Sequence, residues 1–155
     1  MKELRIRTYP DPILKKRSEK IKPEDIKSPK IQKLISNMFK FMEENNGLGL
    51  AAPQIGKSLQ LCVINFGGER HVLINPKVVS KSWRKEICEE GCLSFPGKFI
   101  QIKRPRKVTV KGLDENGEKF KITADGLLSK ALQHETDHLN GVLFIEHEAK
   151  KKKNG

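Results

Sequence analysis

Hydrophobic residues recur at helical spacing in one segment of the chain, and start and stop signals mark a second helix. The first begins at Ser28-Pro29, where serine suits the N-cap and proline the first helical position, and it ends at Asn46-Gly47. Its apolar residues fall on one face: Ile31, Leu34, Ile35, Met38, Phe39 and Met42. The second segment runs from about Asp125, a residue suited to the N-cap, to Asn140, with Gly141 as its stop. We therefore expect an N-terminal amphipathic helix and a C-terminal helix.

Between these helices the hydrophobic period shortens to that of β-strands. Five segments have this character: residues 59–66, 70–76, 77–83, 106–113 and 118–123. The run Asp114-Glu115-Asn116-Gly117 separates the last two and predicts a hairpin turn. Residues 10–30 are rich in proline and lysine and predict an irregular lead-in. The order of helix, several strands and helix favours the α+β class, with a mostly antiparallel sheet packed around the C-terminal helix.

Length and composition set the limits of this picture. A chain of 155 residues suits one compact domain, which we expect over residues 1–148, followed by a disordered basic tail at 149–155. The start, MKELRIRTYPDP, lacks the apolar segment of a secretion signal, and no stretch reaches the length of a membrane span. Three cysteines make an odd number, so we expect no disulfide framework and a reducing cytoplasm. Cys62, in an apolar run, is expected to be buried.

The net charge of +12 favours anionic surroundings such as nucleic acid or an anionic membrane surface. The alternative is a solubilising lysine-rich surface without a dedicated partner, and we weigh the two equally. Charge by itself therefore selects no function, and the choice depends on the motifs.

The C-terminal helix carries the pattern His134-Glu135-Thr136-Asp137-His138. Histidines four positions apart lie on one face of a helix, so both imidazoles can reach one metal ion, and Glu135 can contact a water on that metal. The alternative is a helix with two histidines by accident. Average composition gives this pattern by chance in about 1% of chains of this length. The pattern therefore predicts a metal site but leaves the reaction open.

A catalytic metal needs a third protein ligand and an open position. The downstream histidine of metzincin proteases would fall where this chain has Phe144, and Glu146 and Glu148 lie too close to serve as a thermolysin-like glutamate. Cys92 is the best upstream candidate, because a thiolate binds zinc or ferrous iron well and Gly91 allows a tight backbone path. The alternative for Cys92 is a buried structural thiol.

A third segment, GLGLAAPQIG at residues 47–56, is rich in small residues. Such a segment lets the backbone approach a ligand closely, although a flexible connection from helix to strand is the commoner role of glycine-rich loops. No GK[ST] follows it, which argues against a phosphate-binding loop.

These three segments together resemble the peptide deformylase family, whose patterns are GxGxAAxQ, EGCLS and QHExDHLxG. This chain matches all three in the same order, at residues 47–54, 90–94 and 133–141. The resemblance extends from Tyr9 to Phe144, and without large insertions the chain is more similar to the shorter bacterial forms. It implies a hydrolase that removes the formyl group from the N-terminal formylmethionine of newly made polypeptides and releases formate.

The resemblance also implies the parts of an active site. The metal ligands would be Cys92, His134 and His138, with water in the fourth position. The metal would usually be ferrous iron, with zinc or nickel as alternatives. Glu135 would act as general base and then as general acid. The side-chain amide of Gln54 and the backbone N–H of Leu93 would donate to the developing oxyanion.

A pocket for the unbranched methionine side chain is implied as well. The substrate-binding residues carried over are Gly47, Leu48, Gly49, Cys88, Glu90, Gly91, Leu127 and Ala131. Gly47 and Gly49 would pair with the substrate backbone, and Glu90, like Gln133, would also orient ligands or loops.

The chain departs from the family at two positions near this pocket. Relatives often have an aliphatic residue in place of Lys130; either the lysine stem lines the wall with its amine reaching out, or the position faces solvent. Phe99 falls near where some relatives place an arginine that touches substrate, so no arginine role is carried over.

Three other interpretations compete with this one. A zinc endopeptidase would cleave internal peptide bonds and ignore a formyl group. A basic nucleic-acid-binding protein would use a closed structural metal site, with Cys88 as the fourth ligand and no role for Glu135. An inactive deformylase fold would be supported by a missing motif residue, and none is missing. In the deformylase interpretation the basic surface, including Lys150 to Lys153, gives the hypothesis of ribosome association, and no membrane partner is expected.

Overall fold

The computed structural model describes residues 4–148 of the chain. The basic tail expected at residues 149–155 lies outside this part. Two α-helices are present within it, α1 at Pro29–Glu44 and α2 at Gly126–Leu139. No helix of the described residues is long and apolar enough to cross a membrane.

Both helices lie close to where the hydrophobic pattern predicts them. Ser28 is the N-cap of α1, and its side chain accepts a hydrogen bond from the backbone N–H of Ile31 at 3.4 Å. At the other end Asn46 adopts a left-handed conformation, with φ of 55°, and terminates the helix. Asp125 occupies the N-cap position of α2, but its side chain makes no capping hydrogen bond. Gly141, with φ of 74°, stops α2 as expected.

Five strands form one antiparallel sheet in the order β1-β2-β3-β6-β7. Their bounds are Gly49–Ala51 for β1, Leu61–Phe66 for β2, Glu69–Lys81 for β3, Lys107–Leu113 for β6 and Lys119–Asp125 for β7. The turn predicted between the last two strands is present, with Asp114 Oδ1 accepting from the N–H groups of Asn116 and Glu118. The prediction of two separate strands at 70–76 and 77–83 is wrong. One continuous strand, β3, runs from Glu69 to Lys81, and its pairing with β6 contains two register shifts.

A second, two-stranded sheet carries the segment around Cys92. It pairs β4, Lys85–Cys92, with β5, Phe95–Pro105. Cys92 lies at the end of β4, where a register shift between Gly91 and Cys92 interrupts the pairing with β5. The irregular lead-in also contains short 3-10 turns, at Pro12–Lys15 and Pro23–Asp25.

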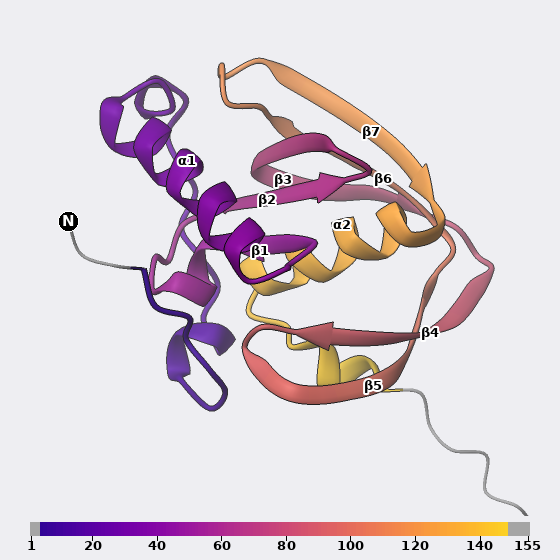
Figure 1. The fold of residues 1–155 in the computed structure, drawn as a ribbon. Coiled ribbons are helices and arrows are strands. Elements are labelled where there is room, and N and C mark those ends of the chain that lie inside the picture. Colours follow the sequence, from indigo (N-terminus) through magenta and orange to yellow (C-terminus); the bar gives the residue numbers. More distant parts are fainter. Residues whose placement is uncertain (1–3, 149–155) are drawn as a thin grey trace, which may run out of the picture.

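The core explains why four successive residues of β2 are buried. Neighbouring strand residues point to opposite faces of a sheet. Leu61 and Val63 belong to the hydrophobic cluster around α1, whereas Cys62 and Ile64 belong to the cluster around α2. The two helices therefore cover opposite faces of the five-stranded sheet, and α2 lies between that sheet and the β4–β5 hairpin (Figure 1). The expected α+β class with antiparallel sheets is confirmed.

Candidate metal centre

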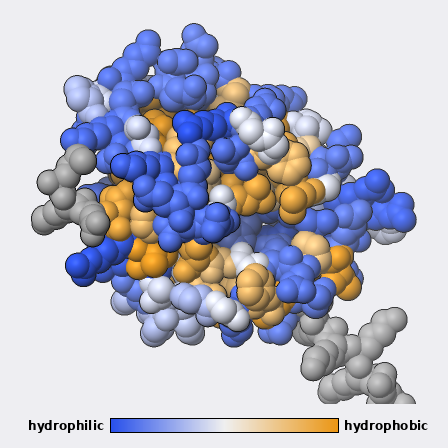
Figure 2. Space-filling model, in the orientation of Figure 1, coloured by the Kyte–Doolittle hydropathy of each residue, from blue (hydrophilic) through white to orange (hydrophobic). Residues whose placement is uncertain are grey.

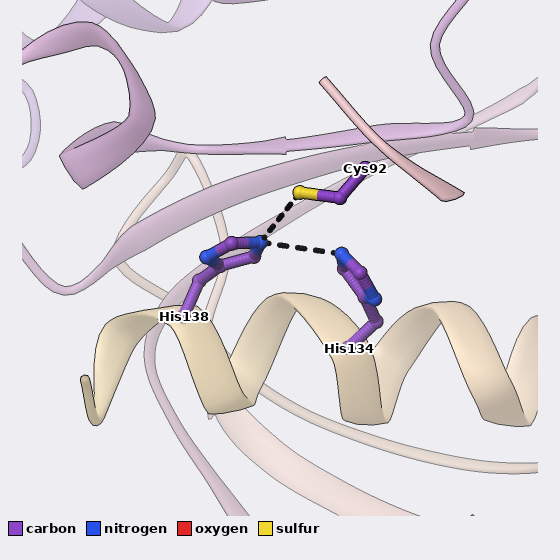
Figure 3. A group of neighbouring side chains, drawn as sticks. All are labelled: Cys92, His134 and His138. Atoms are coloured by element: carbon purple, nitrogen blue, oxygen red, sulfur yellow. Dashed lines mark hydrogen bonds between the residues drawn. The ribbon is translucent and has the colours of Figure 1, made fainter. Parts of the chain in front are cut away.

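Helix α2 presents two histidines, one turn apart, to the same point. The Nε2 atoms of His134 and His138 lie 3.2 Å from each other, and both rings face Cys92 (Figure 3). Burial lowers the pKa of His138 well below its usual value, so this imidazole is neutral and its Nε2 can offer a lone pair. Its Nδ1 is buried without a hydrogen-bond partner in the described part of the chain.

Cys92 brings the third donor atom from the end of β4. Its Sγ lies 3.3 Å from His138 Nε2, and the donor atoms of Cys92, His134 and His138 all lie within 4.8 Å of one another. One sulfur and two imidazole nitrogens suit zinc, ferrous iron or nickel. This donor set fits one divalent metal, and Cys88 is not part of it among residues 4–148.

Glu90 fixes the orientation of His134. Its Oε1 lies 2.9 Å from His134 Nδ1. Burial alone would raise the pKa of Glu90, but hydrogen bonds with His134 and Arg104 lower it to about 2. An ionised carboxylate only accepts hydrogen bonds, so Nδ1 of His134 donates its proton to Glu90. Burial alone would lower the pKa of His134, but hydrogen bonds with Cys92 and Glu90 raise it to about 10, so a metal would take the place of the proton on Nε2.

Arg104 connects this carboxylate to the rest of the site. It is 2% exposed, and its Nε and Nη2 contact the two oxygens of Glu90 at 2.6 Å and 3.1 Å. Its Nη1 donates to Asp137 Oδ2 at 2.9 Å, and His147 Nε2 lies 3.1 Å from the same oxygen. The sequence does not reveal this network. Asp137 stands inside the motif, but a single arginine on a polar strand gives no signal of its burial.

Glu135 lies between the metal ligands and the glycine-rich segment. It is 4% exposed, and its Oε2 has no hydrogen-bond partner among the described residues. Burial raises the pKa of Glu135 to about 7, with His134 and Arg104 partly opposing the rise. A Cβ on residue 49 would stand 3.0 Å from Glu135 Cγ and Cδ, so the glycine at this position leaves room for the carboxylate.

Gln54 is buried against the cysteine segment. Its Oε1 accepts from the backbone N–H of Ala51 at 2.9 Å, which fixes the orientation of the amide. Its Nε2 then donates toward Ser94 Oγ at 3.2 Å and Cys92 Sγ at 3.5 Å. The N–H group of the Gln54 amide therefore points toward the place where the ligand atoms of the metal site converge.

A pocket of about 720 Å³ opens over this site, and Figure 2 shows the hollow bordered by hydrophobic surface. All metal-binding, catalytic and substrate-binding residues predicted from the sequence line it except the buried His138. They are Gly47, Leu48, Gly49, Gln54, Cys88, Glu90, Gly91, Cys92, Leu93, Leu127, Ala131, His134 and Glu135. Residues from three distant segments are thus brought to one cavity.

The two departures from the family pattern also line this pocket. Lys130 has a side chain 12% exposed, and its Nζ donates to Glu86 Oε2 at 2.9 Å on β4. The first alternative for this residue therefore holds, because the stem lines the wall while the amine reaches outward. Phe99 is 66% exposed at the rim. Gln133 lies outside the pocket lining and donates to Pro105 O and Ser129 Oγ, which is a structural role.

Comparison with known proteins gives one consistent result. The chain matches the family model of polypeptide deformylase over residues 3–154. A peptide deformylase of Natranaerobius thermophilus is 46% identical over 143 residues, which cover 92% of this chain and 90% of that protein. A peptide deformylase of Thermodesulfovibrio yellowstonii is 47% identical over 148 residues, which cover 92% of this chain and 87% of that protein. The crystal structure of a peptide deformylase from Thermotoga maritima is similar with a TM-score of 0.90 at 36% identity, covering 97% of this chain and 100% of that one.

Proposed function

The chain belongs to the peptide deformylase family and is a peptide deformylase, and from this premise we propose which of its residues perform each step. The enzyme removes the formyl group from formylated nascent peptides. One observation carries the assignment of roles: the donor atoms of Cys92, His134 and His138 converge beside the buried carboxylate of Glu135. The glycine-rich segment and the cysteine segment border the same pocket.

Cys92, His134 and His138 hold one divalent metal, and we propose ferrous iron as the physiological one. Thiolate and imidazole ligands suit iron, and they also suit zinc and nickel. When bound, such a metal supplies Lewis acidity, which lowers the pKa of water toward neutrality. The Glu90 carboxylate keeps His134 in the tautomer that this requires.

Glu135 moves the proton during the reaction. Its Oε2, which has no partner in residues 4–148, accepts a proton from the attacking water as the new C–O bond forms at the formyl carbon. As the C–N bond breaks, the same oxygen returns the proton to the amine nitrogen of methionine. Formate and the free N-terminus leave, so one water is consumed and Glu135 ends as it began.

Gln54 and Leu93 stabilise the negative charge that develops on the formyl oxygen. The amide of Gln54 is already oriented by Ala51, so little rearrangement is needed when the charge appears. The backbone N–H of Leu93, next to Cys92, is the second donor. Both groups belong to residues that line the pocket.

The remaining lining residues bind the substrate. Gly47 and Gly49, with Leu48 between them, offer backbone groups to an extended peptide. Leu127, Ala131 and Cys88 form an apolar wall for the methionine side chain, together with the stem of Lys130. Glu90 and Gly91 border the same space.

We place the reaction in the cytoplasm, where nascent chains leave the ribosome. The net charge of +12 supports an encounter with ribosomal RNA through the basic surface of the enzyme. A zinc endopeptidase remains the rival enzyme class, and it is separable by its products.

The test is formate release from formyl-Met-Ala-Ser by protein loaded anaerobically with ferrous iron, nickel or zinc. Acetyl-Met-Ala-Ser serves as the matched substrate without a formyl group. We expect formate and free Met-Ala-Ser from the first peptide and no product from the second. Cleavage of the Met-Ala bond in either peptide, without formate, would instead establish an endopeptidase.

A further inference from the structure

The rim of the pocket exposes large apolar side chains. Phe99 from β5 is 66% exposed, Leu127 at the start of α2 is 58% exposed and Leu48 before β1 is 36% exposed. All three line the pocket. Exposed apolar groups gathered at the mouth of a cavity mark a contact surface for a ligand.

The backbone on which Phe99 packs holds its ring in place. Phe99 stands directly opposite Gly91 in the pairing of β4 with β5. A Cβ on residue 91 would lie 2.6 Å and 2.8 Å from two ring carbons, so the ring covers the bare glycine backbone. An aromatic ring that covers a glycine across two strands stabilises the pair and is itself restrained. A peptide that contacts this ring therefore has little side-chain freedom to remove.

The position of the ring relative to the metal site selects what it contacts. Gly91 is adjacent to the ligand Cys92, and the formyl group reacts at that ligand cluster. An extended peptide rises about 3.3 Å per residue, and its side chains alternate between two faces. The residues that follow formylmethionine must therefore leave through the rim, and because consecutive side chains point to opposite faces, either the second or the third can reach the side that Phe99 lines.

We infer that Phe99 is a specificity-determining residue that favours substrates with an apolar or aromatic side chain at the second or third position. The inference rests on the proposed function. Glu89 and Lys98, two charged residues that also line the pocket, have opposite signs, so they add no consistent preference for acidic or basic substrates. Partial burial of one such side chain corresponds to about a 5- to 10-fold preference in kcat/KM.

The test compares two peptide series, formyl-Met-X-Ser and formyl-Met-Ala-X, with X as Leu, Phe, Ser or Asp. The proteins are the wild type, Phe99→Ala, Phe99→Leu and the control Ile87→Ala. Ile87 is also exposed, at 59%, on the same hairpin, but it does not line the pocket. The readout is the ratio of kcat/KM between apolar and polar X, which a purely structural role would not change.

In at least one of the two series, kcat/KM of the wild type and of Ile87→Ala should be about 5- to 10-fold higher for Leu and Phe than for Ser and Asp. Phe99→Ala should bring this ratio to about 1, and Phe99→Leu should keep part of it. Equal ratios in wild type and Phe99→Ala, with all peptides deformylated, would overturn the role of Phe99 and leave the deformylase assignment intact. No formate from any peptide would instead contradict the proposed function.

Discussion

At the scale of single residues, the space around Glu135 depends on a missing side chain. We predict that Gly49→Ala lowers kcat by about 10- to 100-fold, because the new Cβ would stand 3.0 Å from Glu135 Cγ and Cδ and displace the carboxylate. Steady-state kinetics with formyl-Met-Ala-Ser checks the prediction, and metal analysis shows whether the ligands are still occupied. Unchanged kcat with full metal content would mean that the carboxylate tolerates the shift.

Cys62 provides a prediction about pH. This thiol is fully buried on β2, and burial raises its pKa well above the ordinary value of 9.0, with the charge of Glu135 adding to the rise. Above pH 9.0 the folded protein therefore retains the Cys62 proton where the unfolded chain releases it. The contribution of Cys62 to stability is complete below pH 9.0 and is lost as the pH rises above this value.

Alkylation at pH 8 with iodoacetamide, read by mass spectrometry of peptides, tests whether the Cys62 thiol is buried and protonated in the folded protein. We expect Cys62 to stay unmodified in the native enzyme and to react once the protein is denatured. Modification of Cys62 in native protein at the rate of a free thiol would show that β2 opens or that the thiol is not shielded.

The residues of the metal site differ in how far the sequence reveals them. Helical spacing indicates His134 and His138 as ligands. The need for a third ligand makes Cys92 the best candidate but leaves a buried structural thiol as an alternative, and only the resemblance to the family implies the full set that the structure brings together. Arg104 could not be found in this way. On β5 it follows the exposed Lys103, and its burial depends on two carboxylates from other elements, Glu90 and Asp137.

At the scale of elements, Arg104 joins β4, β5 and α2 behind the metal site. We predict that Arg104→Met destabilises the protein by about 3–5 kcal/mol, because it leaves the partly buried carboxylates of Glu90 and Asp137 without their partner. The same substitution should weaken metal binding by about 10- to 100-fold, since Glu90 would no longer hold His134 as firmly. Urea unfolding and competition with a metal chelator measure the two effects.

Arg106→Met is the matched control for this substitution. Arg106 pairs with Glu86 at 3.4 Å, but both side chains are well exposed, at 49% and 38%. Exposed ion pairs contribute little to stability because solvent and salt screen them, so the control should change stability and metal affinity little. Equal effects of the two substitutions would contradict the special role of the buried arginine.

Helices and strands were predictable to different degrees. Helices α1 and α2 and the β6–β7 hairpin carry strong local signals, namely a serine cap, an apolar stripe and a turn sequence. β1 has three residues, too few for a pattern. β4 and β5 contain charged residues, glycine and proline, and their stability comes from pairing with each other rather than from propensity. Such strands become visible only in the tertiary structure.

At the scale of the whole molecule, charge is the feature that the active site does not explain. The expectation of one catalytic domain over residues 1–148 stays a prediction, as does the disordered tail. Deleting residues 149–155 removes Lys150 to Lys153 and lowers the net charge from +12 to +8. If the proposed ribosome contact uses these lysines, the truncated enzyme should bind ribosomes more weakly and with a shallower dependence on salt.

Sedimentation with ribosomes at several salt concentrations measures this effect, with activity on a free formyl peptide as the control. Binding that is unchanged by the deletion at every salt concentration would exclude the tail as the contact. Ribosome affinity that falls only together with activity on the free peptide would point to damage of the fold.

We propose that Glu135 transfers the proton at a site where Cys92, His134 and His138 would hold the metal. The most direct measurement is formate release from formyl-Met-Ala-Ser by iron-loaded wild type and Glu135→Gln, with metal content determined in the same samples. We predict full metal content in both proteins and a loss of kcat of at least about 100-fold in the variant. Formate release by Glu135→Gln at the rate of the wild type, with metal bound, would contradict the account.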